Sequence, residues 1–309
     1  MTEKIIEPVD IGFLEAELTS EKFLRHTNKG GNDIYVVTAH NSPNVMREIG
    51  RLREIAFRSA GGGTGKNCDI DRFDTMPNPC RQLIVWDPEE KMILGAYRFI
   101  CGSEITLDAG GCPDIATGHM FNFSEKFIKE YLPYTIELGR SFVRLEYQST
   151  KIGTKAIYVL DNLWDGLGAL THIYPDMKYL FGKVTMYPEY TRACRDMILY
   201  FLNKYFPDTD SLVRPIEELA VDIGNAGLEQ IFNGGDFASD FRILNARIRE
   251  TGNTIPPLFH AYMSLSPTMR MFGTAVNKEF GDVEETGIFL KIDEIRQEKK
   301  QRHIDTFQP

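Results

Sequence analysis

Apolar and polar residues follow two different periods along this chain. Short runs rich in β-branched and aromatic residues are typical of strands, whereas apolar residues that recur every three or four positions indicate helices. After Ser42, a residue suited to capping a helix, and Pro43, four apolar residues of 43–58 fall on one face. Strands are predicted at 33–38, 81–86, 92–100, 136–147, 179–186, 269–276 and 286–292. Helices are predicted at 13–18, 43–58, 121–131, 156–170, 188–205, 237–248 and from 255 onward.

The predicted strands and helices interleave, and a turn at 87–90 joins two adjacent strands as a hairpin. This order favours a mixed α/β (α+β) sheet flanked by helices over a doubly wound parallel sheet. We expect a single domain over 1–309. Within it, 208–255 is predicted to be a mainly helical insertion, and 293–309 a charged tail that is helical or frayed.

The strand at 136–143 carries two charged residues, Glu137 and Arg140, among apolar neighbours. A charge in a buried strand destabilises the fold unless it is paired or hydrogen-bonded. Two interpretations follow. The residues form a structural ion pair, or they belong to a site where burial tunes a charged group for chemistry. The strand by itself leaves both open.

A glycine-rich segment at 60–66 ends in Gly65-Lys66, as the phosphate-binding loop motif does. Ala60 stands where that motif needs its first glycine, and Asn67 replaces its Ser/Thr, so we interpret the segment as a mobile loop that could order over a ligand. The acidic cluster that follows, Asp69 to Asp74, is either a solvated loop or a recognition site for a cationic group. Because it lacks the glycine and the distal Glu of a calcium loop, we expect no metal site.

Composition narrows the class of protein. The chain has 309 residues and a formal net charge of −9, whereas a general nucleic-acid-binding protein would be basic. The five cysteines lie at least eleven residues apart, which fits no zinc site and suggests reduced thiols. No signal-peptide pattern or membrane-length apolar run is found. We therefore expect a cytoplasmic protein, and peripheral contact with the inner membrane face stays open.

Four motifs follow one another along the chain: ELGRS at 137–141, LWDGL at 163–167, YLFG at 179–182 and IPPLFHAY at 255–262. In this order they resemble the N-acyltransferases of amino-acid lipid synthesis, a family of the GNAT acyltransferase fold. Its members make the lyso forms of ornithine or glycine lipids and are often misnamed hemolysins. The resemblance spans about residues 33–292 and implies a GNAT-like fold with an acyl-thioester donor.

A second pattern combines an Arg and a Phe four apart on a helix, two Asp three apart, an Arg ending a strand, and a Glu and an Arg on the central strand. Its residues are Arg53, Phe57, Asp71, Asp74, Arg98, Glu137 and Arg140. This pattern resembles, more distantly, the motif of the acyl-homoserine lactone synthases. Their tryptophan between the Phe and the first Asp is absent here, so the resemblance implies the fold and the donor type but not the lactone-synthase activity.

These resemblances imply roles in the attack of a primary amine on a thioester. Glu137 is the expected general base, directly or through a water, because a desolvated carboxylate has a raised pKa. Arg140 is expected to organise Glu137 or to bind the acceptor's carboxylate, with Arg98 as the second candidate for that carboxylate. Asp71 and Asp74 are expected to position Arg53.

The donor site is expected around the central strand and the loop after it. Backbone N–H groups of Phe142 and Val143 would hold the thioester oxygen, and Ser141 belongs to the same segment. The loop keeps Gly153 of the pyrophosphate motif of CoA-dependent relatives but not its flanking residues, which favours acyl-phosphopantetheine. Lys151 and Lys155 would contact its phosphate or an acidic carrier, or are simply exposed. Four aromatic residues either line the acyl tunnel or, as is more common, are simply core residues: Phe99, Phe142, Phe181 and Phe259.

The sequence therefore predicts an N-acyltransferase of aminolipid biosynthesis without a tightly bound cofactor. Its expected partners are acyl carrier protein, carrying a fatty, 3-hydroxy acyl group, and a small amino-acid acceptor, glycine rather than ornithine. Coenzyme A is the alternative donor. Two other functions stay open: a GNAT enzyme with another amine acceptor, such as a signal synthase of the homoserine lactone type, and a non-catalytic, hemolysin-like membrane-associated protein.

Overall fold

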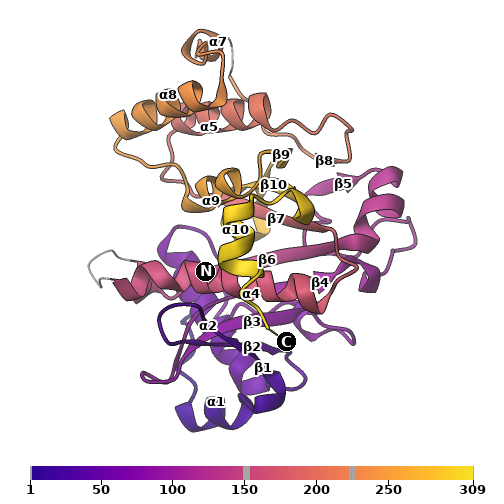
Figure 1. Cartoon of the computed structure of the whole chain (residues 1–309), viewed down its shortest axis with the longest axis vertical. Coiled ribbons are helices and arrows are strands. Elements are labelled where there is room, and N and C mark those ends of the chain that lie inside the picture. Colours follow the sequence, from indigo (N-terminus) through magenta and orange to yellow (C-terminus); the bar gives the residue numbers. More distant parts are fainter. Residues whose placement is uncertain (1, 149–153, 223, 225–226, 309) are drawn as a thin grey trace.

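A mixed, eight-stranded sheet forms the centre of this computed structural model, which describes residues 2–148, 154–222, 224 and 227–308. The strand order is β1-β2-β3-β4-β6-β7-β10-β9, and every neighbouring pair is antiparallel except β6 with β7 (Figure 1). The mixed α/β sheet expected from the sequence is confirmed. Its strands are β1 (Phe23–His26), β2 (Asp33–Val37), β3 (Arg81–Asp87), β4 (Met92–Cys101), β6 (Thr135–Val143), β7 (Tyr179–Met186), β9 (Arg270–Asn277) and β10 (Val283–Lys291).

Helices cover both faces of this sheet. The apolar stripe of α2 packs with Ile84, Trp86 and Ala96 on one face, whereas α4 packs with Leu83 and Tyr97 on the other. The helices are α1 (Ile11–Glu17), α2 (Pro43–Ser59), α3 (Arg72–Thr75), α4 (Thr154–Ile173), α5 (Arg192–Tyr205), α7 (Leu228–Ile231), α8 (Phe237–Glu250), α9 (Pro257–Leu265) and α10 (Gln297–Lys299).

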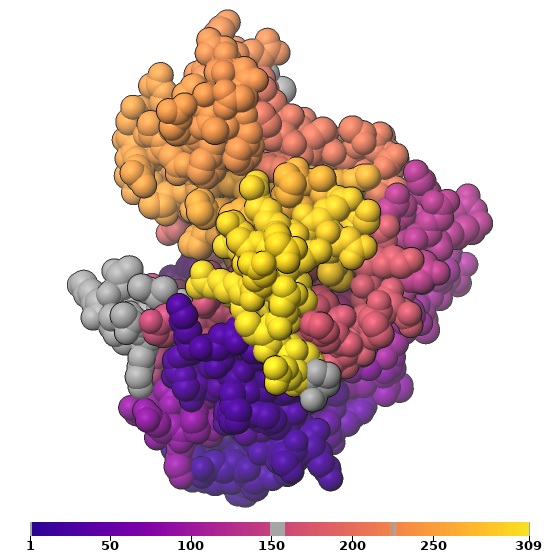
Figure 2. Space-filling view, in the orientation of Figure 1, coloured from indigo at the N-terminus to yellow at the C-terminus, as the bar shows by residue number. Residues whose placement is uncertain are grey.

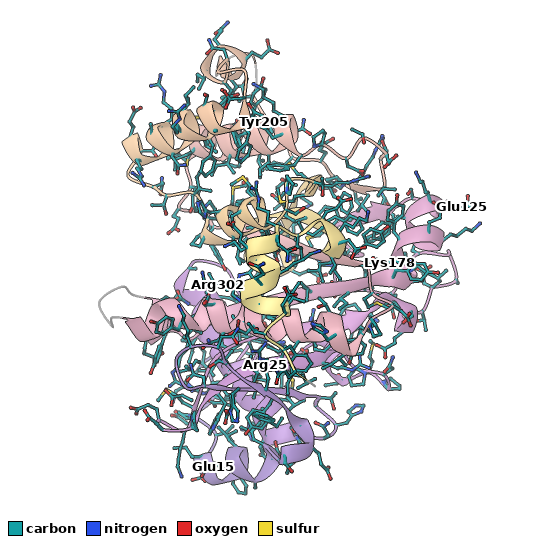
Figure 3. All side chains as sticks on the ribbon, viewed as in Figure 1. Glu15, Arg25, Glu125, Lys178, Tyr205 and Arg302 are labelled. Carbon is teal, nitrogen blue, oxygen red and sulfur yellow. The ribbon has the colours of Figure 1, made fainter. Side chains whose placement is uncertain are left out.

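Two glycines let α4 approach its neighbours closely. A Cβ atom on Gly166 would stand 2.6 Å from a methyl carbon of Leu83, and one on Gly168 would stand 2.0 Å from the carbonyl oxygen of His303. The C-terminal segment therefore lies directly on α4 (Figures 2 and 3). There, His303 Nδ1 and Asp165 Oδ1 are 2.8 Å apart.

The helices α5, α7 and α8 lie together beyond the β9 edge of the sheet (Figure 1), and their apolar residues belong to the same core as those of α4. Phe237 and Phe241 of α8 pack on Phe201 of α5, with ring centroids 5.5 and 5.9 Å apart. Residues 208–255 supply α7, α8 and the short strand β8 (Val213–Pro215). β8 pairs with β5 (Phe121–Phe123) in a two-stranded sheet outside the main one.

Three of the predicted elements differ from the structure by more than three residues. Residues 121–131 are not one helix, because β5 takes the first three residues and only Phe127–Tyr131 forms a π-type turn. α5 begins at Arg192 instead of near 188, since the Thr191 hydroxyl caps it by accepting the Cys194 N–H at 3.3 Å. β6 ends at Val143 instead of continuing to 147, and a 3₁₀ turn follows it.

The start of α2 is at Pro43 as predicted, but Ser42 does not cap it with its side chain. The carboxylate of Glu17 does so instead, accepting the N–H groups of Asn44 and Val45 at 3.1 and 2.9 Å. A carboxylate at a helix N-terminus satisfies free N–H groups and is favoured by the helix dipole. Sequence spacing could not indicate this cap, because Glu17 comes from a different helix.

Candidate active site

The two central strands separate halfway along their length. β6 and β7 pair in parallel only from Thr135–Tyr179 to Glu137–Phe181. Beyond that point β6 continues along β4 as far as Val143, and β7 continues along β10 as far as Met186. A gap therefore opens in the middle of the sheet, directly after Glu137.

A β-bulge at Arg140 shapes the β6 side of this gap. Arg98 of β4 faces Gly139, whereas Ala96 faces Phe142, so β6 has one extra residue between these two pairs. Arg140 takes a left-handed backbone conformation with φ of 52°, which is strained for a residue other than glycine. Such strain often accompanies functional sites.

A cavity of about 530 Å³ fills the gap and reaches both faces of the sheet. At the α4 face its wall is apolar and includes Tyr97, Leu138 and Val184, whereas Lys183 and Glu285 line it at the other face. Of the predicted site residues, those that line the cavity are Phe57, Arg140, Ser141, Phe142 and Val143. Phe99, Phe181 and Phe259 do not line it and are fully buried core residues, so of the four aromatic residues considered for an acyl tunnel only Phe142 lines the cavity.

Glu137 lies behind this cavity and is only 1% exposed. Neither carboxylate oxygen has a hydrogen-bond partner among the described residues, and Glu137 is not part of the cavity wall. Burial raises the pKa of Glu137, and the positive charges of Arg98 and Lys183 oppose that effect only in part. The neutral form of this carboxyl group is therefore favoured more strongly than that of a solvent-exposed glutamate.

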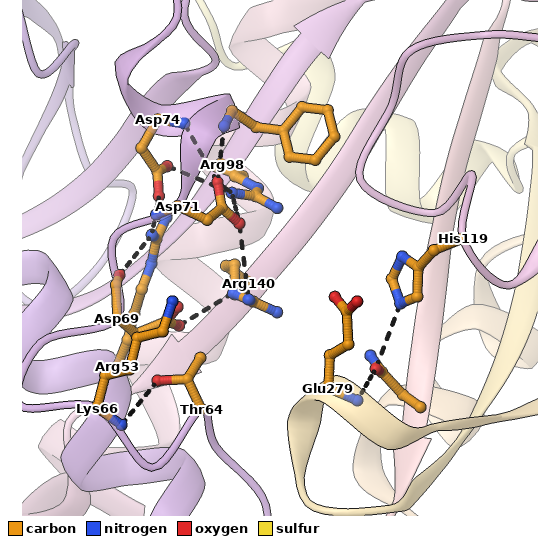
Figure 4. A network of polar contacts seen from close by, with 12 residues as sticks. Arg53, Thr64, Lys66, Asp69, Asp71, Asp74, Arg98, His119, Arg140 and Glu279 are labelled. Atoms are coloured by element: carbon orange, nitrogen blue, oxygen red, sulfur yellow. Dashed lines mark hydrogen bonds and ion pairs between the residues drawn. The ribbon is translucent and has the colours of Figure 1, made fainter. Parts of the chain in front are cut away.

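Four of the predicted motif residues, all on the β4 side of the gap, are joined by ion pairs: Arg53, Asp71, Asp74 and Arg98 (Figure 4). Arg53 donates to Asp74 at 3.0 Å and to the side-chain oxygen of Gln82 at 2.5 Å. Arg98 donates to both oxygens of Asp71 at 2.8 Å. Burial by itself would raise the pKa of Asp74, but Arg53 and Arg98 bring it down to about 2. Asp74 is therefore a permanent anion that holds two guanidinium groups.

α3 fixes this network by its own capping box. The Asp71 side chain accepts the N–H groups of Phe73 and Asp74 at 2.9 and 3.3 Å, and Asp74 accepts the N–H of Asp71 at 3.1 Å. The four-residue helix thus presents both carboxylates in one orientation. The expectation that Asp71 and Asp74 together position Arg53 is half right: Asp74 does so, and Asp71 binds Arg98.

Arg140 does not pair with Glu137, contrary to the first interpretation of the central strand. Its Nε lies 2.9 Å from Asp69 Oδ2, and its Nη2 lies 3.6 Å from Asp71 Oδ2. Residues three apart in a regular strand point to opposite faces, and the extra residue of the bulge brings Arg140 to the face of Glu137, where Asp69 and Asp71 pair with it. Arg98 is likewise paired with aspartates instead of Glu137. It is 2% exposed and does not line the cavity.

Only one of the two backbone N–H groups proposed for the thioester oxygen faces the gap. The N–H of Arg144 donates to the carbonyl of Leu94 in β4 at 2.7 Å. Successive N–H groups of a strand point to opposite sides, so the Phe142 N–H also points to β4 and the Val143 N–H points to the gap. Lys151 and Gly153 lie outside the described residues, and the side chain of Lys155 in α4 is not described.

The glycine-rich segment at 60–66 is held in place by Glu54. Its buried carboxylate accepts the N–H of Thr64 at 3.1 Å, the N–H of Gly65 at 2.8 Å and the Thr64 hydroxyl at 2.8 Å. Arg58 pairs with the same carboxylate at 2.8 Å. An internal anion thus occupies the N–H groups that a phosphate would need, which agrees with the rejection of a phosphate-binding loop, and the mobility of the segment stays a prediction.

Sequence reasoning missed the ion pair of Lys183 and Glu285. Lys183 on β7 and Glu285 on β10 are hydrogen-bonded to each other, and both line the cavity. Glu285 also accepts from Thr185 at 3.2 Å and from Asn277 at 2.9 Å. A lysine within the buried strand 179–186 was the available signal, of the same kind that had drawn attention to Glu137.

The described residues contain no group of three or more His, Cys, Asp or Glu side chains placed to hold a metal ion. Nor does any helix within them have the length and hydropathy needed to cross a membrane.

Comparisons with known proteins identify the family. Residues 52–156 match the acetyltransferase (GNAT) domain family. The chain is 61% identical over 305 residues to a glycine N(alpha)-acyltransferase of Bacteroides thetaiotaomicron, covering 99% of this chain and 90% of that protein. It is 60% identical over 305 residues to the protein of the same name from Phocaeicola vulgatus, covering 99% and 94%.

A solved structure, the N-acyl amino acid synthase FeeM from uncultured soil microbes, aligns with a TM-score of 0.42 and 9% identity, covering 85% of this chain and 93% of that one. The family membership rests on the two sequence relatives, which extend over nearly the whole chain. The predicted resemblance is confirmed: this chain is an acyltransferase and belongs to the family of these glycine N(alpha)-acyltransferases.

Proposed function

We propose that this protein transfers a fatty, 3-hydroxy acyl group from the phosphopantetheine thioester of acyl carrier protein to the α-amine of glycine. The two relatives named for glycine, at 61% and 60% identity, support glycine as the acceptor in preference to ornithine. The resemblance to the N-acyltransferases of aminolipid synthesis supports the carrier-bound donor and a role in lipid biosynthesis. The protein then needs no tightly bound cofactor, because the thioester itself is a substrate.

One observation carries the geometry of this proposal: the cavity passes through the sheet where β6 leaves β7. Its apolar end, at Tyr97, Leu138 and Val184, suits a pantetheine arm and an acyl chain. Its other end, at Arg140, Lys183 and Glu285, suits a small zwitterion. A thioester placed in the gap would meet the amine at the boundary between these two environments.

In the proposed reaction the amine nitrogen forms a bond to the thioester carbon, and the carbon–sulfur bond breaks. The acceptor gives up two protons in all, one from its ammonium form and one from the nitrogen after attack, and the leaving thiolate takes one proton. Glu137 accepts the other through a water, because its carboxyl group lies behind the cavity wall. The raised pKa of Glu137 suits this task, since a base works best when its pKa lies near the working pH.

The oxygen of the tetrahedral intermediate needs hydrogen-bond donors that are already in place. We assign this task to the N–H of Val143, which points to the gap, rather than to that of Phe142. The strained bulge at Arg140 serves this arrangement, because it sets the register of the last residues of β6 against β4. Covalent catalysis is not part of the proposal.

The direct test is to incubate the purified protein with 3-hydroxyacyl carrier protein and single amino acids, including glycine and ornithine. Thiol release and product mass are followed, with 3-hydroxyacyl-CoA as a parallel donor. We expect N-acylglycine from the carrier-bound donor. Formation of no acylated amino acid with any acceptor or donor would contradict the proposal. Product from ornithine but not from glycine would contradict only the acceptor.

A further inference from the structure

A band of polar side chains crosses one face of the sheet, and it includes Lys183. Facing residues of paired strands and alternate residues of one strand share a face. Gln82 faces Arg98, Arg98 faces Gly139, Glu137 faces Phe181, and Thr185 faces Glu285. The band therefore runs through Gln82, Arg98, Glu137, Lys183 and Glu285. Lys183 is the cation of this band that lines the cavity.

Lys183 has donor capacity left to bind a ligand. Its side chain is 9% exposed, and the only hydrogen bond of its ammonium group found among the described residues goes to Glu285. A lysine ammonium can donate three hydrogen bonds. Glu285, which also lines the cavity, already accepts hydrogen bonds from Lys183, Thr185 and Asn277. The donors of the pair that are free for a ligand therefore belong to Lys183.

Arg140 supplies a second cation at the same end of the cavity. Its side chain is 13% exposed, and its guanidinium carbon lies 4.4 Å from the centre of the Phe280 ring. The ring and Asp69 fix the orientation of the guanidinium group, which reduces the entropy lost when it binds an anion. Lys183 and Arg140 lie on the two strands that part, β7 and β6.

We propose that Lys183 binds the carboxylate of the acceptor amino acid, from the opposite side of the gap to Arg140. This inference rests on the proposed function and adds the residue that recognises an α-amino acid as such. One carbon separates the carboxylate from the amine in an α-amino acid. Holding the carboxylate between β6 and β7 therefore keeps the amine beside the gap, close to Gly139 and the thioester.

The test compares glycine with glycinamide, which keeps the amine and lacks the anionic carboxylate. Two variants remove the charge without leaving a bare buried carboxylate. Lys183→Gln keeps a donor toward Glu285, and Lys183→Met/Glu285→Gln replaces the pair by uncharged groups, which is far less disruptive than removing one partner. The matched control is Lys291→Met on the exposed Lys291–Glu294 pair, whose atoms are 2.9 Å apart and which lies outside the cavity.

The measured quantity is kcat/KM for glycine divided by kcat/KM for glycinamide. The two amines differ in basicity, but this difference affects wild type and variant equally, so it cancels when their ratios are compared. We expect this ratio to fall roughly 10- to 100-fold in both Lys183 variants, the range for loss of one charge-assisted hydrogen bond, mainly through KM for glycine. The Lys291→Met control should keep the wild-type ratio. Thermal unfolding confirms that each variant is folded.

Three outcomes would overturn the inference. The wild type could show no preference for glycine over glycinamide, or the Lys183 variants could keep the wild-type ratio. Alternatively, both acceptors could lose the same factor in kcat, which would make Lys183 a base or a structural residue. If the wild type acylates no amino acid at all, the proposed function fails instead, so the two failures are distinguishable.

Discussion

Two groups of buried charged side chains on this face of the sheet differ in how their charges are compensated. On the β4 side, Asp74 forms ion pairs with Arg53 and Arg98, and all three residues are buried and do not line the cavity. On the β7 side, Glu137 has no hydrogen-bond partner among the described residues and Lys183 faces the cavity. The pKa of Asp74 is lowered to about 2, whereas burial raises that of Glu137.

This difference distinguishes charged residues that stabilise the fold from charged residues suited to catalysis, although both lie on the same face of the sheet. A carboxylate held by two guanidinium groups cannot exchange a proton near neutral pH, so Asp74 is suited to hold α3 and α2 against the sheet. A carboxyl group without partners, beside a cavity, can exchange one. Charged residues that share a motif therefore need not share a role, and the four predictions below test that division.

The largest effect is expected from Glu137→Gln, which removes the proposed base without changing its size. The rate constant kcat should fall about 10²- to 10⁴-fold, the usual contribution of a general base, with KM for the acyl donor little changed. Steady-state kinetics with glycine and acyl carrier protein measure both. The variant should remain folded, because glutamine resembles the neutral form that burial favours. Activity within a few-fold of wild type would show that another group takes the proton.

The second prediction concerns stability on the paired side. Arg53→Leu leaves Asp74 with one cation fewer in a fully buried site, and we expect a loss of about 3–5 kcal/mol in the free energy of unfolding. Urea denaturation measures it. The double variant Arg53→Leu/Asp74→Leu removes both charges and should recover much of the loss, although Arg98 then keeps only Asp71. A single variant as stable as wild type would mean that this network does not hold the fold together.

The third prediction uses pH, because the two carboxyl groups have pKa shifts of opposite sign. The folded state holds the Glu137 proton more tightly than the unfolded state, in which the pKa of the side chain is 4.5. The contribution of protonated Glu137 to the free energy of unfolding is therefore present below pH 4.5 and is lost as pH rises through the pKa of the folded state. Relative to Glu137→Gln, the wild type should lose at most about 1.4 kcal/mol per pH unit over that range.

Asp74 gives the opposite dependence of stability on pH. Its contribution to the free energy of unfolding is present above its pKa in the unfolded state, 3.8, and is lost as pH falls toward its pKa in the folded state, about 2. Denaturation curves of the wild type and Glu137→Gln, recorded between pH 4 and 8, isolate the Glu137 effect, and the rate of the wild type should rise over the same range in which its stability falls. A stability difference between the two proteins that is flat with pH, or that grows in favour of the wild type, would contradict the raised pKa.

The sequence predicts the scaffold better than the site, for physical reasons. The apolar period of α2 and the β-branched runs of β3 and β4 follow from local spacing, and these elements are where the pattern places them. The partner of Arg140 does not follow from spacing, because the bulge that redirects it depends on the register between β4 and β6. The gap between β6 and β7 is likewise a property of pairing, so nothing in either strand alone indicates that Lys183 would meet a cavity.

The smallest effect is expected at the surface end of the network, where Arg72 of α3 pairs with Asp114. The two side chains are 63% and 31% exposed, so water already solvates both charges and their attraction is screened. Arg72→Ala should change the free energy of unfolding by less than about 1 kcal/mol and leave kcat unchanged. Arg72 belongs to the same short helix as Asp74. This variant therefore tests whether the loss of stability depends on membership of α3 or on burial of the charged group. A loss as large as that of Arg53→Leu would mean that the orientation of α3 depends on its exposed side, and the buried pairs would then not be sufficient to hold the two carboxylates in place.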